Sequence, residues 1–257
     1  MDCKKAAENL YSAEKGVYQI DTISIENTDM TVQDAYEIQL LNVKNRIEDG
    51  DKIIGMKIGL TSKAMQNLLG VREPDYGHLT DKMLLLEGET CPMDELIQPK
   101  VEGELAFCLK KSLKGPGVTI ADVYNATGWV VPAIEIVDSR IKDWKIKLVD
   151  TIADNGSSAR LVLGGRMTNI KDIDMRLIGM NLEKNGELVS TGTGAEVWGS
   201  PAAAVAWLIN KLATFDIGLD EGNIVLSGAI TAAENAVSGD SFTVSFQGMG
   251  SVTVKFK

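Results

Sequence analysis

Histidine is almost absent from this sequence, since His78 is the single one among 257 residues. A metal site built from several histidines is therefore excluded, and a Ser-His-Asp triad is excluded unless His78 is its base. The three cysteines, Cys3, Cys91 and Cys108, are odd in number and match no zinc-binding spacing. We interpret Cys108, which lies in an apolar run, as a small buried hydrophobic residue. If the protein is an enzyme, carboxylates, lysines or a bound metal must carry its chemistry.

Long apolar runs are missing as well. No stretch approaches the roughly 20 apolar residues of a membrane span, and residues 1–16 lack the apolar segment of a signal peptide. The formal net charge of -10 disfavours nucleic acids and anionic membranes as partners. We therefore expect a cytoplasmic protein in a reducing compartment. An apolar fraction of 44% is ample for a sizeable core.

The first 50 residues have helical character. Residues 31–49 are predicted to form a helix, with Thr31 as the N-cap, Asp34 at the capping-box spacing and Gly50 as the end. Residues 1–12 are expected to form another. The apolar stripe expected to pack inward consists of Tyr36, Leu40, Val43 and Ile47.

Further along the chain the apolar pattern changes to alternation, which is typical of strands. In residues 52–60, Lys57 shares one strand face with Gly55 and Gly59. Residues 101–109 and 129–137 are predicted to form two more strands, and the last 35 residues alternate again.

Two local signals complete the pattern. Asn185-Gly186 predicts a hairpin turn, and Ser200-Pro201 predicts the start of a helix that runs to about Leu212, with Ser200 as its cap. The predicted helices lie near the N-terminus and once late in the chain, and many short strands lie between and after them. This order indicates an α+β fold rather than regular βαβ repeats. We expect a small N-terminal α/β region over residues 1–70 and a larger, strand-rich domain over residues 71–257.

Glu102 and Glu104 are the most informative residues. Residues two apart in a strand point to the same face, about 6.6 Å apart along the chain. The same face continues with the uncharged Ala106 and Cys108, which favours burial, and buried anions need a partner or a cation. The alternative is a pair of surface glutamates on a solvated face, where most carboxylates lie.

Glu135 is the single charge in the apolar run VVPAIEIV. One interpretation is an ion pair with Arg140 or Lys142. The other is a third carboxylate ligand, because three oxygen donors and few histidines suit Mg2+ or Mn2+ and leave positions open for a 2-oxo acid.

Other polar residues are candidates with an ordinary structural alternative. Lys57 is either an active-site cation that holds or protonates substrate, or an edge-strand lysine. Asp75, in the turn-rich segment REPDYGHL, is either an acid–base group or a turn-forming aspartate. The run ADNGSS, with Asp154, Ser157 and Ser158, either contacts substrate or builds a loop; residues 227–231 either line a pocket or form a turn.

Seven segments in combination resemble the 2-keto-4-pentenoate hydratase and 4-oxalocrotonate decarboxylase group of the fumarylacetoacetate hydrolase superfamily. They are KIGLTSKAM, EPDYGHL, PKVEGELAF, PAIEIVDSRI, DTIADNGSS, GSPAAAVAWLINKL and IVLSGAITAA. The resemblance covers the chain from about residue 30 to the end. Two positions depart from the pattern: Gly156 replaces the usual alanine, and Ser200 replaces a histidine found in many relatives.

The resemblance implies a small N-terminal helical region followed by a catalytic domain, residues 71–257, built as a mixed β-roll. It also implies a homo-oligomer, pentameric or decameric. The implied reaction is metal-dependent hydration of a 2-hydroxy-2,4-dienoate to a 4-hydroxy-2-oxo acid during aromatic meta-cleavage catabolism, and a complex with a neighbouring pathway enzyme is an open expectation. The implied metal ligands are Glu102, Glu104 and Glu135; the implied catalytic residues are Lys57, Asp75 and Glu104; the expected substrate contacts are Leu60, Asp154, Ser157, Ser158 and Thr231.

Three alternatives remain open. A 4-oxalocrotonate decarboxylase would use the same metal site: ITAA at 230–233, SSAR at 157–160 and the ending FQGMGSVTVKF resemble the decarboxylases, whereas PDYG resembles the hydratases. We favour hydration because Asp75 would take part in the chemistry. A C–C bond hydrolase would need a His–Glu pair, for which His78 lies in the wrong context. A non-catalytic homologue is disfavoured because all the expected ligands are present.

Overall fold

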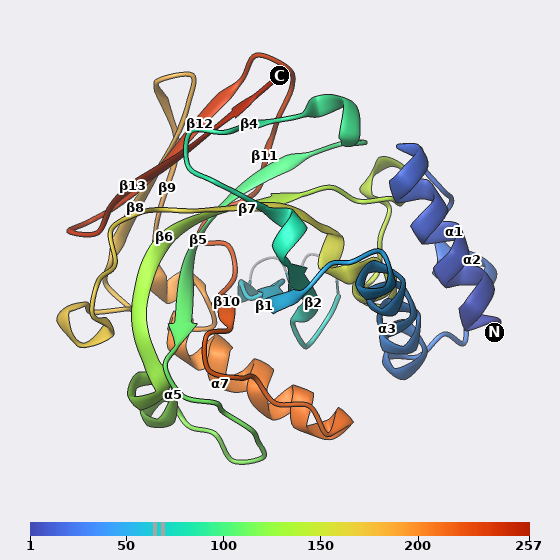
Figure 1. The fold of residues 1–257 in the computed structure, drawn as a ribbon, viewed down its shortest axis with the longest axis horizontal. Coiled ribbons are helices and arrows are strands. Elements are labelled where there is room, and N and C mark those ends of the chain that lie inside the picture. The colour runs from blue at the N-terminus through green and yellow to red at the C-terminus, as the bar shows by residue number, and fades with distance from the viewer. Residues whose placement is uncertain (64–65, 68–69) are drawn as a thin grey trace.

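Three helices form the N-terminal part of the computed structural model, which describes residues 1–63, 66–67 and 70–257. They are α1 (Cys3–Gly16), α2 (Ile23–Glu26) and α3 (Val32–Glu48). They lie together on one side of the molecule, shown in blue in Figure 1. The helix expected over residues 1–12 thus begins at Cys3 and continues to Gly16.

Helix α3 has the expected ends but a different buried face. Thr31 caps it in a capping box with Asp34, as predicted. The inward stripe was partly wrong, because the side chains of Leu40 and Ile47 are 37% and 48% exposed. The helix packs against both α1 and α6 (Leu148–Ala153), so its buried face is rotated from the expected stripe. The buried residues are Ala35, Tyr36, Ile38, Gln39 and Val43.

A large mixed sheet carries the residues of greatest interest. Its strand order is β2-β1-β10-β5-β6-β7-β3, with β11 paired to β5. Strands β5 and β6 are long and antiparallel, while β1 lies parallel to β10 and antiparallel to β2. The bounds are β1 (Ile53–Gly59), β2 (Asp75–Thr80), β3 (Leu84–Leu85), β5 (Lys100–Leu109), β6 (Thr127–Val137), β7 (Ser158–Leu163), β10 (Ile224–Leu226) and β11 (Glu234–Asn235).

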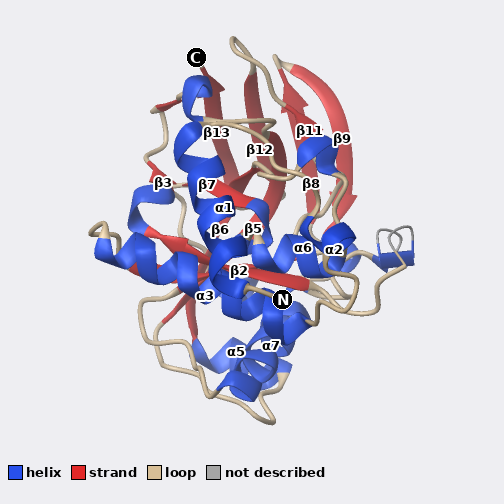
Figure 2. Ribbon diagram, turned by 90° about the vertical axis from the view of Figure 1, so that its right-hand side faces the viewer, coloured by secondary structure: helices blue, strands red, loops and turns tan. Residues whose placement is uncertain are grey.

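A second sheet packs on the first, and the main core lies between them. Its order is β4-β13-β12-β8-β9, and its strands rise at the top of Figure 2. The predicted hairpin is confirmed: Asn185 and Gly186 both have positive φ and join β8 to β9. The bounds are β4 (Thr90–Cys91), β8 (Gly179–Lys184), β9 (Glu187–Thr193), β12 (Ser241–Phe246) and β13 (Gly250–Phe256).

Two further helices, α5 (Ile120–Ala126) and α7 (Pro201–Leu212), lie at the end of the molecule opposite the second sheet (Figure 2). Helix α7 begins at Pro201 as predicted, but the side chain of Ser200 makes no capping hydrogen bond with any described residue. Short 3-10 turns connect the elements: η1 (Asp81–Met83), η2 (Met93–Glu95), η3 (Lys142–Trp144), η4 (Asn155–Ser157), η5 (Ile170–Asp172), η6 (Gly194–Glu196) and η7 (Ala213–Phe215).

The α+β prediction with a small helical N-terminal region is confirmed. The boundary near residue 70 stays a prediction; β1, which precedes it, pairs with β10, which follows it. Within the described ranges, no helix is both long and apolar enough to cross a membrane.

Candidate metal centre and active site

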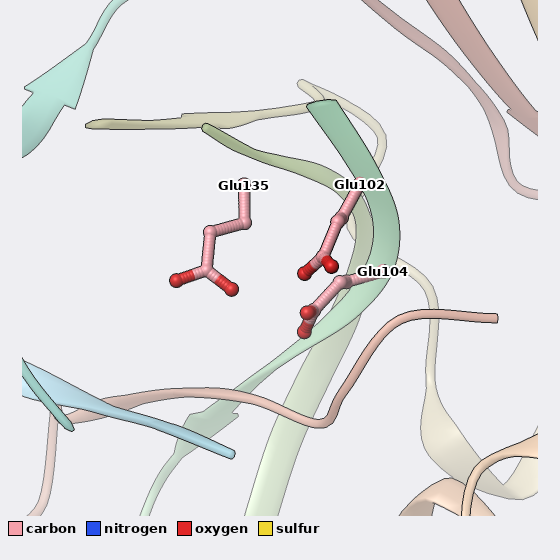
Figure 3. Close-up of side chains that lie close together, drawn as sticks. All are labelled: Glu102, Glu104 and Glu135. Atoms are coloured by element: carbon pink, nitrogen blue, oxygen red, sulfur yellow. The ribbon is translucent and has the colours of Figure 1, made fainter. Parts of the chain in front are cut away.

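Two neighbouring strands bring three glutamates to one point. Glu102 and Glu104 project from the same face of β5, and Glu135 of β6 is the direct register partner of Glu102. Carboxylate oxygens of the three residues lie within 4.8 Å of one another. Figure 3 shows the three carboxylate groups gathered in a common space. Glu104 and Glu135 are fully buried, and Glu102 is partly exposed.

Gly103, between the two glutamates of β5, allows the second sheet to pack closely. A Cβ atom at this position would lie 2.6 Å from Met180 Sδ and 3.1 Å from Val244 Cγ2. Successive residues of a strand face opposite sides, so Gly103 faces the core while its neighbours face the carboxylate cluster. The segment Glu-Gly-Glu thus places two carboxylates on one face of β5 and allows close packing of the second sheet on the other.

The cluster is electrostatically unfavourable on its own. Burial and the nearby charges of Glu135 and Glu102 raise the pKa of Glu104 well above its usual range. Burial and, in smaller part, Glu135 raise the pKa of Glu102 to about 7, and burial also raises the pKa of Glu135. Bringing three ionised carboxylates together in a buried place is costly without a compensating cation.

Carboxylate oxygens without hydrogen-bond partners make the cluster suitable for binding a hard divalent cation. Glu104 Oε2 accepts a hydrogen bond from the backbone N–H of Gly228 at 2.8 Å. Glu104 Oε1 and both carboxylate oxygens of Glu135 have no hydrogen-bond partner in the described part of the chain. Buried acceptors are normally satisfied, and Mg2+ and Mn2+ prefer oxygen ligands of this kind. The alternative in which Glu102 and Glu104 form a solvated surface pair is therefore wrong.

Lys57 of β1 lies beside this cluster. Its Nζ is 3.4 Å from Glu135 Oε2 and 3.7 Å from Asp75 Oδ1, and it donates a hydrogen bond to Gly156 O at 3.0 Å. Burial alone would lower the pKa of Lys57, but the charges of Glu135 and Asp75 outweigh it and raise the pKa. The edge-strand alternative is wrong, because β1 is paired on both sides and Lys57 is buried. Glu135 therefore pairs with Lys57 and not with Arg140 or Lys142.

Glycines on the face of Lys57 make room for neighbours, as the sequence suggested. A Cβ on Gly59 would lie 2.3 Å from Asp75 Oδ1, and a Cβ on Gly55 would lie 1.8 Å from the backbone oxygen of Ile224. Gly59 therefore admits the carboxylate of Asp75, and Gly55 admits the backbone of β10.

Asp75 lies in a strand and not in the turn-rich loop that its sequence context suggested. It is the first residue of β2, paired with Gly59 of β1, and it is buried. Its Oδ2 accepts a hydrogen bond from Thr151 Oγ1 at 2.8 Å, while Oδ1 has no hydrogen-bond partner among the described residues. The turn-forming alternative is therefore wrong, because the β1–β2 pairing continues to this residue.

A cavity of about 560 Å³ adjoins the cluster. It brings together six of the residues proposed from sequence: Lys57, Leu60, Asp75, Glu102, Ser157 and Thr231. Two residues that the sequence analysis did not single out, Lys100 and Trp144, also line it. Lys100 shares a strand face with Glu102, so the alternation that identified the glutamates could also have identified Lys100.

Asp154 and Ser158 do not line this cavity. The carboxylate of Asp154 is held by Arg140, whose Nε lies 2.5 Å from Asp154 Oδ1, and it also accepts a hydrogen bond from Ser157 Oγ at 3.1 Å. Asp154 is therefore engaged by a residue of the segment that follows β6. Ser158 is fully buried at the start of β7, and its hydroxyl has no hydrogen-bond partner within the described ranges.

Two further residues complete the account of the sequence-based candidates. His78 is buried, its Nδ1 lies 2.8 Å from Gln39 Oε1, and burial lowers its pKa to about 4. It is a structural residue of β2 and does not line the cavity. Cys108 is partly exposed rather than buried.

Comparison with known proteins agrees with this geometry. Residues 72–257 match the family described as fumarylacetoacetate (FAA) hydrolase, C-terminal. The chain is 44% identical to 2-hydroxyhexa-2,4-dienoate hydratase of Comamonas testosteroni over 251 residues, covering 97% of this chain and 95% of the relative. It is 50% identical to 2-hydroxypent-2,4-dienoate hydratase of Pseudomonas putida over 211 residues, covering 82% of this chain and 95% of the relative.

A solved structure is similarly close. The 4-oxalocrotonate decarboxylase from Pseudomonas putida G7, complexed with magnesium and adipate, matches with a TM-score of 0.95 and 39% identity, covering 99% of this chain and 97% of that chain. Sequence, fold and site together lead to one conclusion. This chain belongs to the fumarylacetoacetate hydrolase family, in the group that contains the 2-keto-4-pentenoate hydratases and the 4-oxalocrotonate decarboxylases.

Proposed function

We propose that this protein is a divalent-metal-dependent lyase that adds water to a 2-hydroxy-2,4-dienoate and forms a 4-hydroxy-2-oxo acid. The observation that carries the proposal is the cluster of Glu102, Glu104 and Glu135, with Lys57 and Asp75 beside it and a cavity of about 560 Å³ adjoining it. The hydratases among its relatives support the same reaction.

Glu102, Glu104 and Glu135 would hold the cation, Mg2+ or Mn2+. A related decarboxylase that binds magnesium supports a divalent metal at this site. When bound, such a cation supplies Lewis-acid stabilisation of the enolate that forms at the 2-oxygen of the substrate.

Lys57 and Asp75 are the groups proposed for proton transfer. Lys57 Nζ lies 3.7 Å from Asp75 Oδ1, and both residues line the cavity. The 2-hydroxyl of the dienol loses its proton and the terminal carbon gains one, which leaves an α,β-unsaturated ketone. Water then adds its oxygen to carbon 4, and a proton moves to carbon 3. Asp75 Oδ1, which has no hydrogen-bond partner among the described residues, would accept the proton from water, and Lys57 Nζ would donate one.

The remaining polar and apolar contacts divide into two groups. Leu60, Ser157 and Thr231 line the cavity and would contact the substrate directly. Ser158 and Asp154 would act indirectly, by positioning other residues. Ser158 begins β7 and pairs with the end of β6, the strand that carries Glu135. Asp154 holds Ser157 through the hydrogen bond between their side chains.

Decarboxylation of 4-oxalocrotonate is the second candidate, because loss of CO2 also leaves an electron pair that an enolate can accept. The close match to a solved 4-oxalocrotonate decarboxylase favours it. The deciding experiment assays 2-hydroxypenta-2,4-dienoate and 4-oxalocrotonate side by side with Mg2+, and follows 4-hydroxy-2-oxo acid formation and CO2 release. Hydration without CO2 release supports the proposal, CO2 release supports the alternative, and turnover of neither substrate contradicts both.

A thermal-shift measurement tests the site independently of turnover. We expect Mg2+ together with oxalate to raise the melting temperature more than either alone, because ligands that bind only the folded state stabilise it. Replacing Mg2+ with EDTA should remove the shift. A non-catalytic homologue with a decayed site would show no shift at all.

The cellular setting is also part of the proposal. We expect a cytoplasmic homo-oligomer, pentameric or decameric, that can associate with a neighbouring enzyme of aromatic catabolism. In the described ranges the three cysteines are free, as a reducing compartment favours. Light scattering after size exclusion tests the oligomeric state, and a monomer would contradict it.

A further inference from the structure

The cavity contains a second cation besides Lys57. The ammonium of Lys57 is surrounded by Glu135, Asp75 and Gly156 O. Lys100 lines the same cavity, two residues before Glu102 on the same face of β5, so the two Cα atoms are about 6.6 Å apart. Lys100 therefore lies just beyond the carboxylate cluster, along the cavity wall.

Trp144 holds the side chain of Lys100 over the cavity. Lys100 Nζ lies 4.6 Å from the centre of the Trp144 ring, within the range of a cation–π interaction. The indole Nε1 of Trp144 in turn donates a hydrogen bond to Gln98 O at 3.2 Å. Asp143 and Trp144 both have positive φ, an uncommon conformation that persists where the surrounding structure enforces it.

The ammonium of Lys100 has no ionic partner in the part of the chain that the structure describes. Among the residues that the structure describes, no carboxylate oxygen lies within 4.0 Å of its Nζ, and the ammonium forms no side-chain hydrogen bond. A ring face leaves the N–H donors of an ammonium free. Lys100 is thus a half-buried cation with unused donors that faces the same cavity as Glu102.

The segment beside β5 that lines the cavity is mainly apolar and adds one unused hydroxyl. Residues 229–233 line the cavity and lead into β11, whose Asn235 is the register partner of Lys100. Within this segment Thr231 Oγ1 is buried without a hydrogen-bond partner in the described residues. Lys100 and Thr231 thus offer an ammonium and a hydroxyl as hydrogen-bond donors to an anion in the cavity, and charge-assisted hydrogen bonds of this kind are strong.

We propose that Lys100 binds a second carboxylate, at the far end of the substrate, and that the protein therefore prefers dicarboxylic over monocarboxylic 2-oxo acids. This inference rests on the proposed function, because it assumes that the 2-oxo acid end of the substrate lies at Glu102, Glu104 and Glu135. Lys100 is then a specificity-determining residue, and it takes no part in proton transfer.

Two ligands of equal length isolate the second carboxylate. 2-Oxohexanedioate and 2-oxohexanoate share the 2-oxo acid end and differ only at the sixth carbon. Binding of each to the wild-type protein with Mg2+ is measured by isothermal titration calorimetry. We expect the dicarboxylate to bind at least about tenfold more tightly, as one charge-assisted hydrogen bond allows.

Variants assign the preference to Lys100. Lys100→Met should weaken 2-oxohexanedioate by about tenfold and leave 2-oxohexanoate unchanged, whereas Lys100→Arg should keep most of the preference. Lys110→Met is the matched control, because it removes the same charge from an exposed position just after β5. It should change neither affinity.

The outcomes separate this inference from the proposed function. Equal affinities of the wild type for the two ligands would overturn the role of Lys100 and leave the metal-bound 2-oxo acid intact. Equal weakening of both ligands by Lys100→Met would mean that Lys100 acts on the metal ligand Glu102, and would also overturn it. Failure of both ligands to bind with Mg2+ would overturn the proposed function and this inference together.

Discussion

Glu104 lies where an ionised carboxylate is least favourable, fully buried and close to two other glutamates. Its charge becomes favourable only when a cation shares the space. Substitution of such a side chain should therefore change metal binding more than it changes the stability of the fold.

We expect Glu104→Gln to remove metal-dependent activity and leave the protein folded. The neutral amide keeps the shape of the side chain and removes repulsion from Glu135 and Glu102, so the metal-free variant should be at least as stable as the metal-free wild type. The loss of activity should exceed the roughly 10- to 100-fold loss typical of outer-shell groups. Turnover and the Mg2+-induced rise in melting temperature measure the two effects.

The exposed Glu187→Gln serves as the control for Glu104→Gln, and should match the wild type in both measurements. Wild-type turnover in Glu104→Gln would remove the metal cluster from the mechanism.

Lys57 should affect turnover more than metal binding. Its Nζ is within 3.7 Å of Asp75 and Glu135, but it is not one of the three oxygen donors. We expect Lys57→Met to lower kcat by at least about 100-fold, the usual contribution of an acid–base group. Steady-state kinetics and a Mg2+ titration give the comparison. Equal losses in kcat and Mg2+ affinity would instead assign Lys57 to the metal site.

At the scale of elements, the N-terminal helices are tied to the sheet through one buried amide. Gln39 of α3 donates from Nε2 to Tyr76 O of β2 at 2.9 Å and to Ile152 O of α6 at 2.6 Å. Its Oε1 contacts His78 Nδ1 at 2.8 Å. Because Asp75 is also in β2, this network helps to position the candidate active site.

Gln39→Leu should destabilise the fold by about 3 kcal/mol, because it leaves two buried carbonyls and a ring nitrogen without their partner. Urea unfolding monitored by circular dichroism measures the change. Gln33→Leu, on the exposed side of the same helix, is the matched control and should change the free energy of unfolding by less than about 0.5 kcal/mol. A change of similar size in both variants would show that the buried amide has no special role.

For the whole molecule, the single histidine gives a specific acid dependence. Burial lowers the pKa of His78 to about 4 in the folded protein, from an unperturbed value of about 6.5. The unfolded chain therefore binds a proton that the folded protein does not bind between these two pH values. The contribution of neutral His78 to the free energy of unfolding is therefore fully present above about pH 6.5. It decreases as the pH falls toward 4, by about 3 kcal/mol.

Chemical unfolding between pH 7 and 4 measures that loss, and the proton NMR signal of the only histidine ring reports its pKa without ambiguity. A midpoint near 6.5 in the folded protein would contradict burial of a neutral His78.

Local patterns predicted several of the elements, but they placed the start of β2 in a turn-rich loop. Alternation located β5, an apolar run located β6, the capping box located the start of α3, and Asn185-Gly186 located the hairpin. These signals are local because they depend on side-chain direction and backbone conformation within a few residues. The buried face of α3 could not be predicted in the same way, because it depends on packing against two other helices, α1 and α6.

The sequence by itself determined which residues could form the candidate site. The lone histidine excluded a metal site built from several histidines, and Glu-Gly-Glu in a strand with apolar neighbours favoured two carboxylates on one buried face. Only the tertiary structure decided that Glu102 pairs in register with Glu135, that Asp154 is held by Arg140, and that Lys100 faces the cavity over Trp144. The physical reason is that charges distant in sequence interact through space, and their partners depend on strand register and packing, which no local pattern contains.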